Sequence, residues 1–222
     1  MYIDYDLLKS INKELLDNKI SEKIIALTFD DGPHPIVTEK ILDILHDHNV
    51  VATFFVLGEN ADDEENIIKA IIEDGHEIGT HGYGHPRFNK INNKSIEDDI
   101  CDALNITHQY VPNIKWFRPP YGIITKNLKK IMKKNNLNLS LWNIDGQDWK
   151  KNGPDFIFYR IRIEHKNGGI ILLHDIHEDT VTAIPKIIKF LKEKGYVFKT
   201  LSQWKEFVRK NAPKSFKKSF IK

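Results

Sequence analysis

The sequence predicts an α/β protein folded as a closed or nearly closed β/α barrel. From residue 24 onward, short β-branched or aromatic runs alternate with amphipathic stretches, and strict alternation calls for parallel strands joined by right-handed crossovers. About seven such units follow one another without a break in composition, which favours a barrel over an open sheet. Several runs end in acids and histidines, and a barrel brings its strand ends to one rim.

Each predicted strand is a short apolar run, and each predicted helix is a stretch with apolar residues at helical spacing. The run "GIILL" is apolar throughout, as expected for a parallel strand covered on both faces. The units are, in chain order, 24–29 with 38–48, 51–57 with 60–74, 76–81 with 95–110, 115–117 with 125–135, 137–144 with 155–166, 168–175 with 181–195, and 196–200 with 202–211.

Residue types near the helix ends support these boundaries. Thr38 and Ser95 are of the type that caps helix N-termini, and Gly75 and Gly195 follow helices as C-terminal caps. Pro185 falls within the sixth predicted helix. We expect it in the first turn, where a missing N–H costs little.

Two segments flank the predicted barrel domain, which we place at residues 23–211. In residues 1–22, Leu8, Ile11 and Leu15 recur at helical spacing, so we expect an amphipathic helix packed on the barrel. Residues 212–222 form a basic tail, interpreted as a solvated chain end. Contact with an anionic polymer is the alternative, and it requires that truncation after Asn211 abolish a salt-dependent binding.

Composition and charge narrow the class of protein. The 222 residues are 41% hydrophobic and 29% charged, the balance of a soluble globular protein. A net charge of +2 is too small to indicate a nucleic-acid partner. We find no signal peptide or membrane span, so we expect a cytoplasmic protein, or a secreted or cell-wall-associated one if a leader was trimmed. Cys101 is the single cysteine, which excludes an intramolecular disulfide and a cysteine metal cluster.

Two adjacent carboxylates, Asp30 and Asp31, follow the apolar run "IIALTF". Like charges side by side repel, and a shared cation or proton makes such a pair tolerable. If Asp31 binds a cation, Asp30 is free to act as a base toward water on that cation. The competing interpretation is an ordinary turn at Asp-Asp-Gly-Pro, although a turn alone does not need the second aspartate.

His81 and His85 follow the third predicted strand at a spacing that can aim both imidazoles at one point. Two histidines and one aspartate, with an open position for water, form a ligand set of catalytic zinc. A lone His-x-x-x-His pair is more often two surface or capping histidines. The case for a metal therefore depends on Asp30 and Asp31 lying at the same rim.

Arg118 in "RPPYG" and His174 in "LLHD" follow the fourth and sixth predicted strands. Arg118 can orient a carboxylate through a bidentate contact, and a surface arginine is the alternative. His174 ends an apolar run, so its ring needs a partner. Asp148 in "DGQDW" can raise the pKa of His174 and make it an acid at neutral pH. A buried His–Asp pair without chemistry is the alternative.

Asp145 is predicted to lie at the same rim. Trp149 and Trp142 could line an apolar pocket or stack on a sugar, although core packing is favoured for Trp142. The other histidines are interpreted as helix or loop surface, with His34 and His177 set apart because they adjoin the motifs. They are His34, His46, His48, His76, His108, His165 and His177.

Taken together, "TFDDGP", "HGYGHP", "RPPYG", "DGQDW" and "LLHD", in this order, resemble the motifs of the polysaccharide deacetylases of carbohydrate esterase family four, the NodB homology domain. The resemblance runs from about Lys23 to about Asn211. It implies a distorted (β/α) barrel with seven or eight parallel strands. It also implies a divalent metal and hydrolysis of an N-acetyl, sometimes an O-acetyl, group on a sugar.

The resemblance implies catalytic roles for five residues. Asp30 would be the base, and Arg118 would orient it. His174 would protonate the leaving amine, with its pKa tuned by Asp148. The backbone N–H of Tyr121 would help to stabilise the oxyanion.

The resemblance also implies the binding residues. Asp31, His81 and His85 would hold the metal, which is usually zinc, with Co²⁺, Mn²⁺ and Ni²⁺ as ions that the same ligands accept. Leu172 and Trp149 would form the pocket for the acetyl methyl group, beside Tyr121.

One residue departs from the family pattern. The second motif usually carries Ser or Thr directly after its first histidine, and here Gly82 takes that place. Because that hydroxyl helps to brace the loop, we expect backbone contacts to hold His81 and His85 instead. The departure bears on metal affinity and subfamily.

The first hypothesis is a metal-dependent hydrolase that removes N-acetyl groups from amino sugars of a glycan or oligosaccharide, either peptidoglycan or chitin-like. A deformylase or amidase acting on a small molecule with the same site is an alternative. A non-catalytic carbohydrate-binding protein is another, although it would be expected to lack Asp30 or His174. The expected partner is a glycan, with neither nucleic acid nor a membrane span, and the sequence does not indicate an oligomeric state.

Overall fold

One parallel β-sheet, curled as a half-barrel, forms the centre of the fold. The computed structural model describes residues 1–17 and 21–211, so the predicted basic tail at 212–222 lies outside the described residues. The strands are β1 (Tyr2–Ile3), β2 (Lys23–Asp30), β3 (Thr53–Val56), β4 (Glu77–Thr80), β5 (Trp116–Phe117), β6 (Asn138–Ser140), β7 (Ile144–Asp145), β8 (Gly169–His174) and β9 (Tyr196–Phe198).

The strand order confirms the predicted α/β class and its distorted barrel. Eight strands follow the path β1-β6-β5-β4-β3-β2-β8-β7, and β9 pairs with the first residues of β2. All pairings are parallel. Strand carboxyl ends therefore meet at one edge of the curled sheet, where the site residues lie.

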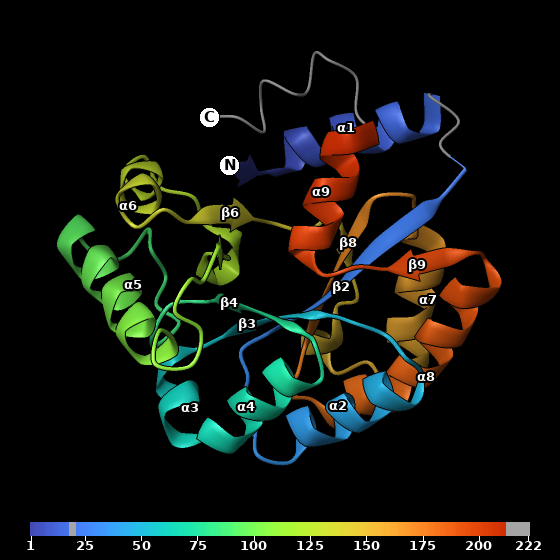
Figure 1. Cartoon of the computed structure of the whole chain (residues 1–222), viewed down its shortest axis with the longest axis horizontal. Helices are drawn as coiled ribbons and strands as arrows, with labels where there is room; N and C mark the ends of the chain where they lie inside the picture. Colours follow the sequence, from blue (N-terminus) through green and yellow to red (C-terminus); the bar gives the residue numbers. More distant parts are fainter. Residues whose placement is uncertain (18–20, 212–222) are drawn as a thin grey trace.

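Helices surround the sheet (Figure 1). One side of the sheet is covered by α2, α3 and α4, and the adjoining side by α5 and α6. The helices α7 and α8 lie across the sheet from α5 and α6. Among the described residues, none of these helices is long and apolar enough to cross a membrane. They are α1 (Tyr5–Asp17), α2 (Val37–Asp47), α3 (Gly58–Asp63), α4 (Glu65–Glu73), α5 (Asn93–Thr107), α6 (Leu128–Lys134), α7 (Pro154–Glu164), α8 (Glu178–Glu193) and α9 (Leu201–Asn211), with short 3₁₀ turns at Pro120–Gly122 and Asp148–Lys150.

The two faces of the sheet have separate cores. A large cluster joins the outer face to α2, α4, α5, α7 and α8. A smaller cluster joins α1 and α9 to strand residues of the inner face, among them Phe55 and Trp116. Leu8, Ile11 and Leu15 of α1 are all buried there. Apolar residues at helical spacing thus put one face of α1 against the sheet.

Three elements differ from the sequence prediction. The predicted strand 137–144 is divided between β6 and β7, because its two ends pair with opposite margins of the sheet. The predicted helix 60–74 is two helices, α3 and α4, with a non-helical backbone at Glu64. The strand β1 was missed, since two residues are too short to show a pattern.

Three of the predicted helix boundaries are wrong. Helix α2 begins at Val37, so Thr38 lies inside it, and α5 begins at Asn93, where the side chain of Asn92 accepts from the Ser95 N–H. Pro185 lies in the middle of α8, which begins earlier than expected. Gly75 and Gly195 do follow helices, with left-handed φ values of 78° and 80°.

Candidate active site

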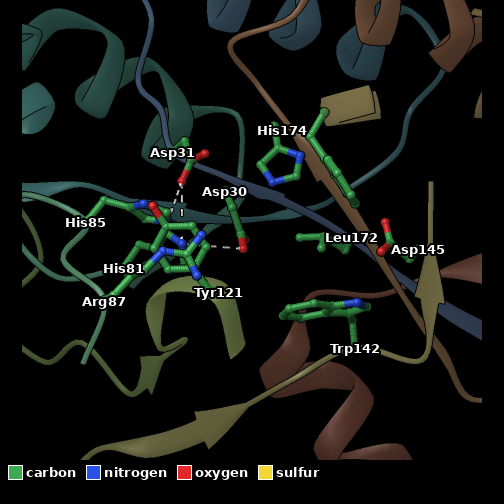
Figure 2. A pocket seen from close by; sticks show the side chains of 11 residues that line it. Asp30, Asp31, His81, His85, Arg87, Tyr121, Trp142, Asp145, Leu172 and His174 are labelled. Carbon is green, nitrogen blue, oxygen red and sulfur yellow. Dashed lines mark ion pairs between the residues drawn. The ribbon is translucent and has the colours of Figure 1, made fainter. Parts of the chain in front are cut away.

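Most of the polar residues predicted to meet at one rim line a common pocket, whereas Arg118, Asp148 and Asp175 are buried and do not line it. It encloses about 420 Å³ and opens at the carboxyl ends of the strands. Figure 2 shows the acids and histidines converging from opposite walls, with Trp142 across the cavity. The lining residues are Asp30, Asp31, His81, His85, Arg87, Tyr121, Trp142, Asp145, Trp149, Leu172 and His174.

Asp31, His81 and His85 form a three-residue cluster that could hold a metal ion, with ligand atoms within 4.8 Å of one another. Asp31 Oδ1 lies 3.4 Å from His81 Nε2 and 3.5 Å from His85 Nε2. Both Asp31 and His85 have left-handed backbones, with φ values of 76° and 57°. The loops thus adopt conformations uncommon for residues with side chains to bring these three groups together.

The donor set fits a divalent cation. Asp31 Oδ1 is buried and has no hydrogen-bond partner among the described residues, so this oxygen is available to coordinate a cation. His81 Nδ1 lies 2.7 Å from the Arg118 carbonyl, which fixes Nδ1 as the donor and leaves Nε2 free toward Asp31. Burial lowers the pKa of His81 to about 3, which keeps its imidazole in the neutral form that binds metals.

Asp30 lies beside this cluster and is held by Arg118. Arg118 Nη1 donates to Asp30 Oδ1 at 2.7 Å and to Thr28 Oγ1 at 2.8 Å, so the carboxylate contact is through one nitrogen and is not the bidentate pair considered from the sequence. Arg118 is fully buried and stacks on Phe55 at 4.1 Å. Burial raises the pKa of Asp30, and the charge of Arg118 opposes this. Asp30 Oδ2 remains on the side of His81, 3.7 Å from its Nε2.

His174 lies on the opposite wall and pairs with Asp148, as predicted. His174 Nδ1 is 2.7 Å from Asp148 Oδ1, and the His174 backbone N–H donates to Asp148 Oδ2 at 2.7 Å. The Thr180 hydroxyl also donates to Oδ2, at 2.7 Å. Burial disfavours the charged imidazole, but the hydrogen bond and charge of Asp148 outweigh it and raise the pKa of His174 to about 9.

The second-motif loop is held from two sides. As expected for Gly82, backbone contacts brace it: the Gly58 N–H donates to the Gly82 carbonyl at 2.9 Å. Asp99 of α5 adds a contact that we did not anticipate, because its Oδ1 accepts from the Gly84 N–H at 3.1 Å. A Cβ at Gly82, whose φ is 89°, would overlap Asp99 Oδ2. The carboxylate thus fills the space that a side chain at position 82 would need.

Asp175 braces the loop of the "TFDDGP" motif, a structural role that the sequence analysis did not predict. Its Oδ1 accepts from the Gly32 N–H at 3.0 Å, and its Oδ2 accepts from the Thr38 hydroxyl at 2.7 Å. Burial raises the pKa of Asp175 to about 7. The only sequence signal was an acid directly after His174.

Aromatic and apolar side chains complete the pocket walls. Leu172 is buried, whereas Trp149 and Tyr121 are about half exposed at the rim. Trp142, expected in the core, is half-buried and faces the cavity across from Asp30 (Figure 2). His34 lies outside the pocket, and its Nδ1 accepts from backbone N–H groups at the start of α2.

Sequence comparison places the chain in a family. The family model of polysaccharide deacetylases matches residues 17–140, more than half of the chain. The chain belongs to the polysaccharide deacetylase family. Within it, a peptidoglycan-N-acetylglucosamine deacetylase of Bacillus cereus is 42% identical over 184 residues, which cover 80% of this chain and 66% of that protein. The chain thus spans just under two thirds of the length of that relative.

Two further polysaccharide deacetylases resemble the chain over most of both lengths. A chitooligosaccharide deacetylase of Sinorhizobium fredii is 31% identical over 81% of this chain and 90% of its own length. The structure of the peptidoglycan deacetylase PdaC from Bacillus subtilis superposes with a TM-score of 0.79 at 34% identity, covering 89% of this chain and 96% of that one. The half-barrel is therefore the fold of that relative as well.

Proposed function

We propose that the chain is a metal-dependent hydrolase that removes N-acetyl groups from amino sugars of a glycan or oligosaccharide. One observation carries the proposal: a single pocket holds the Asp31–His81–His85 cluster together with a carboxylate, Asp30, and an imidazole, His174, which could act as base and acid. The names of the relatives support it, since they include deacetylases of peptidoglycan and of chitooligosaccharides.

Asp31, His81 and His85 would hold the metal. A divalent cation bound there supplies Lewis-acid polarisation of the amide carbonyl and makes water a stronger acid. Two imidazoles and one carboxylate with an open position favour Zn²⁺ as the ion, with Co²⁺, Mn²⁺ and Ni²⁺ as alternatives.

Asp30 and His174 would move the protons of amide hydrolysis. Asp30 is held through Oδ1 by Arg118, so its Oδ2 takes a proton from the attacking water as the new carbon–oxygen bond forms. His174 is oriented through Nδ1 by Asp148, and its Nε2 gives a proton to the amine nitrogen as the carbon–nitrogen bond breaks. The products are acetate and the free amino sugar.

Three residues would position the acetyl group. Leu172 and Trp149 lie in the pocket wall and form an apolar surface for the methyl group. The backbone N–H of Tyr121 would donate to the oxyanion, in a turn whose φ of 58° is left-handed. This strained turn follows two prolines, which limit the movement of the donor.

Asp30 and Asp31 provide the sharpest test, because their roles separate rate from metal binding. Asp30→Asn is expected to lower acetate release by about 10²-fold or more while bound zinc, measured by elemental analysis, stays near one ion per chain. Asp31→Asn is expected to lose the ion, because it removes one of three ligands.

Substrates for this test are N-acetylglucosamine oligomers and peptidoglycan strands, with a chelated sample restored by Zn²⁺ as control. The proposal fails if zinc-loaded protein releases acetate from none of them. Unchanged turnover in Asp30→Asn would remove Asp30 from the role of base.

A further inference from the structure

Arg87 lies at the mouth of the pocket, two residues after His85 and outside the machinery described above. It is exposed and lines the cavity (Figure 2). Its guanidinium carbon lies 3.9 Å from the centre of the Tyr121 ring. His85 also lies beside that ring, with 4.5 Å between the ring centres. A single aromatic ring therefore separates Arg87 from a candidate metal ligand.

The guanidinium of Arg87 is held in place but not neutralised. A guanidinium over a ring contacts it through its face, and this leaves the N–H donors along its edge available. Arg87 forms no ion pair within the part of the chain that the structure describes, whereas Arg118 in the same site is fully buried and paired with Asp30. Arg87 is thus a positioned cation that faces the space a substrate would enter.

The ligand that fits this cation is a carboxylate. The planar fork of a guanidinium matches a carboxylate through two parallel hydrogen bonds. The nearby acids of the pocket already have roles, because Asp30 is bound by Arg118 and Asp31 belongs to the metal cluster. A neutral N-acetylglucosamine oligomer offers the guanidinium only hydroxyl and amide groups, which bind it more weakly than a charged acceptor.

We propose that Arg87 binds a carboxylate carried by the glycan, on the acetylated sugar or the one next to it, and so makes the enzyme selective for acidic glycans. The proposal rests on the proposed function, since it assigns a substrate class to the same pocket. Glycan strands with lactyl carboxylates on alternate amino sugars have this chemistry, and chitin-like oligomers lack it.

Binding to an inactive protein tests the proposal without turnover. Zinc-loaded Asp30→Asn is titrated calorimetrically with lactyl-bearing glycan strands and with the same strands after amidation of their carboxylates. We expect about tenfold tighter binding of the acidic strands, as for a charge-assisted bidentate contact. Adding Arg87→Gln is expected to bring the affinity for acidic strands down to that for amidated ones, and adding Arg87→Lys to keep part of the preference.

Lys90→Gln is the matched control, because Lys90 is an exposed cation on the same segment that does not line the pocket. It is expected to keep the full preference. The proposal is overturned if the protein with Arg87 intact binds acidic and amidated strands equally. It is also overturned if Arg87→Gln weakens the binding of both kinds of strand alike, because Arg87 would then only brace Tyr121. If Arg87→Gln does not fold, as judged by circular dichroism, the Arg87→Lys comparison decides. A preference that depends on Arg87, without acetate release from any glycan, would support this inference and reject the proposed function.

Discussion

His174 owes its charge at neutral pH chiefly to the carboxylate of Asp148. Its burial alone would lower the pKa below the ordinary value of 6.5, and the contact with Asp148 raises it to about 9. A folded-state pKa above the unfolded one contributes stability that is present below pH 6.5 and is lost as the pH rises through about 9. The same shift keeps the His174 ring protonated over the neutral range.

We therefore expect Asp148→Asn to change the pH dependence of activity. Without the carboxylate, burial is opposed only by the charges of Asp30 and Asp31, so the pKa of His174 falls. Because the proposed role of His174 requires a protonated ring, activity that the wild type loses only near pH 9 is expected to be lost at a lower pH in the variant. At pH 8 the expected loss is tenfold or more.

A pH–rate profile of acetate release from pH 5 to 10 measures this shift. Glu178→Gln, which changes an exposed acid near the start of α8, should leave the profile in place. An Asp148→Asn enzyme that kept the wild-type basic limb would show that His174 is not the acid.

At the residue scale, the sequence predicted correctly which side chains at the carboxyl ends of strands lie close together. Asp30, Asp31, His81 and His174 were predicted together because a parallel barrel brings strand ends to one rim. Asp99 and Asp175 were not assigned as braces, because their partners lie in other segments of the chain: the Gly84 N–H for Asp99, and the Gly32 N–H and Thr38 hydroxyl for Asp175. Nothing in the local pattern around Asp99 shows that α5 packs beside Gly84.

At the scale of elements, α5 and the second-motif loop act together. The loop contains two left-handed residues, Gly82 and His85, and Asp99 Oδ1 is bonded to the Gly84 N–H between them. Burial raises the pKa of Asp99, and the loop N–H partly offsets this. The helix thus supplies the support that a hydroxyl at position 82 would otherwise provide.

Removing this contact is expected to loosen the metal site. Asp99→Ala should weaken zinc binding about tenfold, the usual effect of losing an outer support, as measured by competition with a chromophoric chelator. Asp98→Ala, which removes an exposed partner of Lys94 on the same helix, should leave the affinity unchanged. If the affinity of Asp99→Ala equals that of wild type, the backbone contacts from α3 alone hold the loop.

Predicted element boundaries were least accurate where tertiary contacts override the local pattern. The stretch 137–144 reads as one strand, yet it crosses between the two margins of the sheet. The Leu141 N–H donates to Ile3 of β1 at 2.8 Å, and the Asn143 N–H donates to Ile170 of β8 at 3.2 Å. Apolar spacing records that these residues are buried, but it cannot show which strand each one pairs with.

At the scale of the whole molecule, the N-terminal segment helps to complete the half-barrel. Strand β1 pairs with β6, and α1 shares the inner core with α9 and the central strands β2 and β8. Only the last residue of α1, Asp17, falls within the range matched by the family model. These contacts make residues 1–17 part of the same packed body as the barrel, which implies that they unfold with it.

Ile11→Ala tests this cooperativity. Ile11 is buried between α1 and the inner face of the sheet, so its truncation should lower the free energy of unfolding by about 2–5 kcal/mol. In urea, tryptophan fluorescence and far-ultraviolet circular dichroism should report one shared transition at a lower midpoint. Lys13→Ala, on the exposed side of the same helix, should leave that midpoint nearly unchanged. A separate early transition, with the tryptophan midpoint unmoved, would mean that α1 only docks on a barrel that is stable without it.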